Sequence, residues 1–131
     1  MKTMYEFINI AKALSDENRV RALMMLSQDE LCVCQLIEML NLAPSTVSKH
    51  MSILRQARLV TARKQGKWNY YRLPDGEAPE HVLDAVRWVQ KCLAKDKEVI
   101  ADSRKLRRVS KIDKERLCAH YKTKNQTAAR R

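Results

Sequence analysis

The sequence predicts a mostly α-helical fold, with four helices, a β-hairpin and one further long helix in chain order. Three observations predict it. Apolar residues recur at helical spacing over residues 4–57, β-forming residues flank a glycine-containing turn within residues 59–73, and a helical stripe resumes after residue 79. The chain has 131 residues, which is enough for one domain with a modest core and an appendage.

The first three predicted helices are short and amphipathic. The first spans about residues 4–14, and Ser15 or Asp16 caps the second, because short polar side chains accept hydrogen bonds from free helix N–H groups. The third spans about residues 33–41. The predicted inner stripes are Met4, Phe7, Ile8, Ala11 and Leu14, then Val20, Leu23 and Leu26, then Val33, Leu36, Ile37 and Leu40.

A fourth helix is predicted to begin at Pro44, which lacks the N–H group that would be unpaired there, and to end near Ala57. One face carries Val47, Met51 and Leu54, and the segment contains no acidic residue. Short polar side chains let a helix approach base edges and phosphates, so DNA contact is favoured over an ordinary surface helix. The predicted contacts on this helix are Ser45, Thr46, Ser48, Lys49, Ser52 and Gln56.

The hairpin is predicted over residues 59–73, with its turn at 65–67. Arg63, Lys64 and Lys67 cluster around Gly66, where the tip of a hairpin would meet the phosphate backbone. Three cations at a tip are often only a soluble turn, but beside the fourth helix phosphate contact is the better interpretation. The order ααα-α-ββ-α is that of a winged helix-turn-helix.

The last long helix is predicted from about residue 79 to 103, with Val82, Val86, Val89 and Leu93 on one face. This stripe is too far from any other long helix of the chain to be covered, so we expect a long C-terminal dimerisation helix. A homodimer through the first helix and residues 79–103 would place two recognition helices on one side of the duplex. The alternative is that the helix packs back on its own domain.

Charge divides the chain in two. Residues 1–103 hold 15 basic and 13 acidic residues, whereas residues 104–131 hold 11 and 2, so most of the net charge of +11 lies in the second part. We therefore expect a winged-helix DNA-binding and dimerisation domain over residues 1–103 and a basic C-terminal extension over 104–131. No apolar run is long enough for a membrane span and no secretory signal begins the chain, so we expect no membrane partner and a cytoplasmic location with reduced thiols.

Two of the four cysteines, Cys32 and Cys34, lie one residue apart in "ELCVCQL". Soft ions prefer thiolate ligands, although small apolar thiols also pack well in a core. On a helix, residues i and i+2 point about 200° apart, whereas in an extended segment they share a side. We hypothesise that ligand binding selects a conformation in which residues 32–34 are not regular helix, and that this frays the third helix, which leads into the fourth.

Three segments, "ELCVCQL", "APSTVSKHMSILRQARLV" and "RKQGKWNYYRL", in this order and spacing resemble the ArsR/SmtB family of bacterial metal-sensing repressors, over about residues 10–100. The resemblance is strongest to the arsenite- and antimonite-responsive members. It implies a homodimeric repressor of an arsenic-resistance operon, bound to double-stranded operator DNA and released when As(III) or Sb(III) binds the thiolates of Cys32 and Cys34. No cofactor beyond this inducer is required.

The resemblance also bears on which residue would be the third ligand of the arsenic or antimony ion. The arsenite-sensing branch often has a further cysteine three residues after the second, where this chain has Ile37, so Cys118 becomes the candidate third ligand. The zinc-sensing branch uses histidines on the last long helix, and residues 82–103 contain none. Sensing of another thiophilic metal such as Cd, Pb or Zn, or a thiol redox response, remain alternatives. No catalytic constellation stands out, so we expect that the chain is not an enzyme.

Overall fold

The structure is a computed structural model that describes the backbone of residues 3–129 and the side chains of residues 3–121. Its elements are α1 (Met4–Ala13), α2 (Glu17–Leu26), β1 (Leu31–Cys32), α3 (Val33–Leu40), α4 (Pro44–Gln56), β2 (Thr61–Gln65), β3 (Trp68–Arg72), α5 (Glu80–Leu93), α6 (Lys97–Val109) and α7 (Lys114–Ala129).

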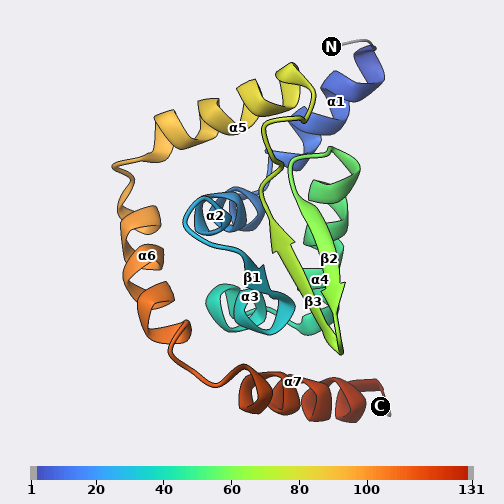
Figure 1. The fold of residues 1–131 in the computed structure, drawn as a ribbon, viewed down its shortest axis with the longest axis vertical. Coiled ribbons are helices and arrows are strands. Elements are labelled where there is room, and N and C mark those ends of the chain that lie inside the picture. Colours follow the sequence, from blue (N-terminus) through green and yellow to red (C-terminus); the bar gives the residue numbers. More distant parts are fainter. Residues whose placement is uncertain (1–2, 130–131) are drawn as a thin grey trace.

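The architecture is a winged helix-turn-helix with a helical wrap. The helices α2 and α3 lie in the middle, α4 and the β2–β3 hairpin lie on the side opposite α6, and α5, α6 and α7 follow one another around the outside (Figure 1). The predicted fold class is confirmed, and the first four helices match their predicted bounds to within a residue or two. Asp16 is the cap of α2, accepting from the N–H groups of Asn18 and Arg19 at 2.8 and 3.2 Å.

The wing contains a third strand that the sequence analysis did not predict. Strand β1 pairs antiparallel with β3, and Cys32 lies opposite Tyr70. Strands β2 and β3 form the predicted hairpin, joined by Gly66 and Lys67. Gly66 has a φ of +61°, a conformation that glycine adopts without steric cost. Because β1 ends where α3 begins, the sheet fixes the position of the cysteine segment.

The prediction of one long helix over residues 79–103 is wrong, because the chain turns after α5 and begins α6 at Lys97. Asp96 causes the new start, since its carboxylate accepts hydrogen bonds from the N–H groups of Glu98 and Val99 at 2.9 and 3.2 Å. The turn lets α5 pack on α2 and α6 pack on α2 and α3. The stripe of α5 is therefore largely covered by the chain itself, as in the alternative interpretation.

Helix α6 is joined to α2 by an ion pair. Arg21 donates to both carboxylate oxygens of Asp102 at 2.9 and 2.8 Å, and Asp102 is 7% exposed. Lys105 also donates to the carbonyl oxygens of Glu38 and Met39, at the C-terminal end of α3, where free carbonyl groups favour a cation. Residue 103 lies within α6, and the division of the chain at that position stays a prediction. Among the described residues no helix is long and apolar enough to span a membrane.

Candidate thiol site and nucleic-acid interface

Cys32 and Cys34 lie on either side of the junction between β1 and α3. Cys32 is extended, with φ −81° and ψ 160°, and is the N-cap residue of α3, whereas Cys34 lies in the first turn of the helix. The N–H of Cys32 donates to Oε1 of Gln35 at 2.9 Å, and both residues are buried. Cys32 is therefore already outside the helix, and only Val33 and Cys34 would have to leave it for the two thiols to share a side.

Cys118 is brought to Cys34 from 84 residues away in the sequence. The two residues form a disulfide, with a Cα–Cα distance of 5.3 Å. Cys118 lies on α7, which packs against α3. The structure thus brings the candidate third cysteine next to the predicted pair, within the same chain.

All three cysteines line one cavity of about 500 Å³. Its walls come from α3, the start of α4, the tip of the wing and α7, and its lining is mixed in polarity. Among its other lining residues are Val33, Ile37, Pro44, Ser48, Lys67 and Trp68. No three His, Cys, Asp or Glu side chains among residues 3–121 already stand in an arrangement that could hold a metal ion. A ligand bound by all three thiols would therefore require a local rearrangement.

Helix α7 presents one side to this cavity and to α3. Lys114, Leu117, Cys118 and Tyr121 are the partly or fully buried residues of its described side chains, at spacing i, i+3, i+4 and i+7. The basic extension was predicted from its charge alone, and this stripe is the signal in the sequence that indicates docking. The side chain of Tyr121 is hydrogen-bonded to Glu38 of α3.

The Tyr121–Glu38 contact makes the docking of α7 sensitive to high pH. Burial, together with the nearby Glu38 carboxylate, raises the pKa of Tyr121 to about 12, from an ordinary value of about 10. The contribution of this contact is fully present below pH 10 and is lost as the pH rises towards 12, because only undocked Tyr121 ionises readily. Burial also raises the pKa of Tyr71, so more than one tyrosine should titrate late. We expect the late part of the tyrosinate absorbance curve to shrink in Tyr121→Phe; an unchanged curve would contradict this assignment.

The predicted DNA-reading face of α4 is exposed as a whole. Val47, Met51 and Leu54 are 0% exposed, and the opposite face, comprising Ser45, Thr46, Ser48, Lys49, Ser52 and Gln56, lies at the surface. His50 is half-buried, and its Nδ1 lies 3.1 Å from a guanidinium nitrogen of Arg19, a structural contact between α2 and α4. The helical-wheel prediction of the buried face is confirmed, while DNA contact by the exposed residues stays a prediction.

The three predicted cations of the wing are exposed but differ in their surroundings. Lys67 lies at the tip, where its Nζ is 3.1 Å from Oε1 of Glu115 on α7. Arg63 lies farther up β2, where it pairs with both carboxylate oxygens of Glu30 and stacks over the ring of Tyr70 at 4.7 Å. The Arg63 side chain is therefore already engaged within the chain.

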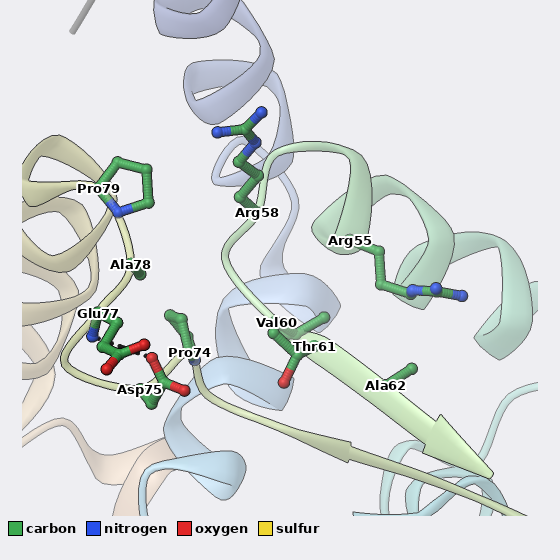
Figure 2. Close-up of a pocket in the computed structure, with 10 residues that line it drawn as sticks. All are labelled: Arg55, Arg58, Val60, Thr61, Ala62, Pro74, Asp75, Glu77, Ala78 and Pro79. Atoms are coloured by element: carbon green, nitrogen blue, oxygen red, sulfur yellow. Dashed lines mark hydrogen bonds between the residues drawn. The ribbon is translucent and has the colours of Figure 1, made fainter.

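A second cavity, of about 450 Å³, lies at the base of the wing. It is lined by Arg55 and Arg58 and by Asp75 and Glu77, yet the two arginines point away from each other and from the two acids (Figure 2). Asp75 accepts a hydrogen bond from the backbone N–H of Glu77, so it serves its own loop. These charged groups do not converge on a common point. Cys92 is a free, exposed cysteine on α5, away from this cavity's lining.

The family comparison and the similar proteins agree on one class of bacterial regulator. Residues 16–62, from α2 to the start of the wing, match the description "Bacterial regulatory protein, arsR family". The chain is 43% identical over 67 residues to the arsenical resistance operon repressor of Escherichia coli K12, covering 50% of this chain and 57% of the relative. It is 41% identical over 80 residues to the arsenic resistance transcriptional regulator ArsR2 of Pseudomonas putida KT2440, covering 60% of this chain and 69% of the relative.

Among solved structures, the homodimeric winged helix-turn-helix DNA-binding domain of Mb0332 from Mycobacterium bovis, described as a possible ArsR-family regulator, matches with a TM-score of 0.59. It is 27% identical, and the match covers 70% of this chain and 81% of that one. The family match ends at residue 62, ahead of α5, α6 and α7. The chain belongs to the ArsR family of bacterial regulatory proteins, which are DNA-binding transcription regulators and not enzymes.

Proposed function

We propose that this chain is a cytoplasmic, homodimeric repressor of an arsenic-resistance operon, released from its operator when As(III) or Sb(III) binds Cys32, Cys34 and Cys118. The observation that carries the proposal is the convergence of three thiols, from the end of β1, from α3 and from α7, on one cavity. Thiolates are the donors that soft, thiophilic ions prefer, and Glu115 brings the single carboxylate among the described residues of this lining. The site fits As(III) or Sb(III) by the chemistry of its sulfur donors. The disulfide between Cys34 and Cys118 must be reduced before these two thiols can bind the ion.

The relatives support the same inducer class. The proteins of E. coli and P. putida are named for arsenical or arsenic resistance. The segment that matches the family holds Cys32 at the end of β1, Cys34 on α3, and the proposed recognition helix α4. The matched segment spans little more than half of the E. coli relative, so the inducer does not follow from the likeness alone. In this chain α3 carries Ile37 on the same cavity, and the proposed third thiol comes from α7.

The test is to count sulfur ligands by X-ray absorption at the arsenic edge of the reduced, arsenite-loaded protein. We expect three sulfur neighbours. Two would show that one of the three cysteines does not bind arsenic, and none would overturn the proposal. In parallel, arsenite should release the protein from a duplex that it selects from random-sequence DNA, here called the selected duplex.

Lys49 of α4 is expected to contact a phosphate. Replacing it by Ala should weaken binding to the selected duplex and lower the slope of log K against log salt by about one, since each neutralised phosphate releases about one counterion. Lys91→Ala, an exposed cation on α5, is the matched control. Fluorescence anisotropy in a salt series measures both, and equal slopes for the two variants would show that Lys49 does not touch DNA.

The homodimer is proposed to form through apolar residues at the outer end of α1 and along α5. Tyr5, Phe7 and Trp88 are 75, 55 and 64% exposed, and α1 and α5 lie at the same end of the molecule (Figure 1). Phe7→Glu should raise the dimer dissociation constant by at least about thirtyfold, because a central aromatic often contributes about 2 kcal/mol or more. Ile112→Glu, which alters an exposed residue elsewhere, should leave the mass seen in sedimentation unchanged.

A thiol redox response is the second candidate, favoured by the Cys34–Cys118 pairing. Here two thiols would give up two electrons and two protons to a peroxide, which is reduced to water and an alcohol or a second water. The two candidates separate on Cys32, because the disulfide does not include it. The arsenite proposal predicts that the Cys32→Ser protein is no longer released from DNA by arsenite. The redox alternative predicts that the same protein is still released by peroxide. Cadmium, lead and zinc belong in the same titration as competing thiophilic metals.

A further inference from the structure

We propose that α7 is a latch that competes with DNA: when it docks on α3 and the wing tip it lies against part of the DNA-binding surface, where it would clash with bound DNA, and the thiol site regulates DNA binding by fastening it there. This inference rests on the proposed function for the identity of the DNA-binding residues. It concerns how release is achieved, and it holds for any event that joins Cys34 to Cys118.

The first step is that α7 touches the tip of the wing as well as α3. Glu115 pairs with Lys67 at 3.1 Å, and Nζ of Lys114 lies 4.9 Å from the centre of the Tyr70 ring. On the other side, Cys118 and Tyr121 contact α3. Figure 1 shows α7 lying across the end of the molecule at which the hairpin tip lies.

The second step is that docked α7 occupies positions where DNA is expected. Ser48 of α4 and Lys67 of the wing line the cavity that α7 closes, and both belong to the predicted DNA-binding residues. The carboxylate of Glu115 neutralises the one predicted cation that lies at the tip itself. It would also stand beside a phosphate, where like charges repel. Docked α7 and bound DNA therefore exclude one another at this point.

The third step is that the docked state is held by weak contacts until the thiols are joined. The Lys67 and Glu115 side chains are 68 and 66% exposed, so their pair adds little, and Leu117 is the buried apolar anchor of the described part of α7. A bond or a shared ligand between Cys34 and Cys118 holds α7 in the docked state. The population of molecules then shifts from the DNA-bound form, with α7 undocked, to the DNA-free form, with α7 docked. Without it, DNA can displace α7.

The experiment locks the latch without any metalloid. In a Cys32→Ser, Cys92→Ser background only Cys34 and Cys118 remain, and diamide takes two electrons and two protons from them as the disulfide forms and it becomes a hydrazine. We expect the oxidised protein to bind the selected duplex at least about tenfold more weakly than the reduced protein, a shift of one decade in the binding constant. A matched protein that also carries Cys118→Ser should not respond to diamide.

Two further variants separate docking from a local effect on α3. In the reduced full chain, Glu115→Gln should tighten DNA binding by up to about fivefold, in line with the small worth of an exposed pair. Glu80→Gln makes the same change of charge at the start of α5 and should have less effect. Leu117→Ser should undock α7 and bind DNA at least as tightly as the parent.

The outcomes distinguish the latch from the proposed function. Equal affinities of the oxidised and reduced forms, equal effects of Glu115→Gln and Glu80→Gln, or weaker binding by Leu117→Ser would each overturn the latch. The last result would make α7 part of the DNA interface. If arsenite still releases the unmodified protein, the proposed function stands; if only oxidation releases it, the latch stands and the arsenite site falls.

Discussion

Replacing Cys34 by Ser is expected to abolish the release of DNA by arsenite, while leaving DNA binding itself in place. Cys34 lies on the first turn of α3, two residues after Cys32, and forms the disulfide with Cys118. The loss should exceed the about 10–100-fold that is typical when a partner beyond the direct ligands is removed, because a direct ligand is lost. Anisotropy of the selected duplex during an arsenite titration measures it.

Cys118→Ser should raise the arsenite needed for release, and Cys92→Ser, which alters an exposed thiol on α5, should not. The sharper control restores a thiol elsewhere. Ile37 lines the same cavity from α3, so Ile37→Cys in the Cys118→Ser background should recover sensitivity if sulfur count is what matters. If this double variant binds arsenite again but is still not released from DNA, release requires that the third thiol lies on α7. A Cys118→Ser protein as sensitive as the parent would remove this residue from the site.

Asp102→Ala is expected to destabilise the fold by about 3–5 kcal/mol, because it leaves the guanidinium of Arg21 largely buried without its partner. The hydrogen bond with the Asp102 carboxylate raises the pKa of Arg21. Because arginine is always protonated in proteins, the guanidinium stays charged when the carboxylate is removed. Chemical denaturation followed by circular dichroism measures the change in the free energy of unfolding.

Glu98→Gln is the matched control for this prediction. Glu98 lies 3.9 Å from the same guanidinium but is 58% exposed, so its loss should change stability by less than about 1 kcal/mol. Equal effects of the two substitutions would show that burial of the Arg21–Asp102 pair does not determine its contribution. Since α6 leads into α7, Asp102→Ala should also weaken the docking of Cys118 on α3.

Local patterns predicted the local structure well. The face formed by Val47, Met51 and Leu54 is buried because a period of about 3.6 residues over a long segment admits few alternatives. The break before α6 was missed because apolar residues continue at helical spacing on both sides of it, although Asp96 is a common capping residue. Strand β1 has two residues, too few to carry an alternating pattern.

The site was predictable only in part. The soft donors of Cys32 and Cys34 follow from residue type and spacing. Cys118 became a candidate because the resemblance implies a third cysteine and this chain has Ile37 at its usual position. That Cys118 reaches Cys34 depends on the turn at Asp96 and on the packing of α6 along α2 and α3. The tertiary fold determines such long-range contacts, and the spacing of residues near each other in the sequence does not predict them.

The separation of Cys34 from Cys118 also sets an order of assembly during synthesis. With 84 residues between them, and translation at about 5–20 residues per second, Cys118 is made about 4–17 s after Cys34. The recognition helix and the wing precede α7 in the chain, so they can fold and meet DNA while α7 is still being made. A newly made subunit would then be able to repress before it is able to respond.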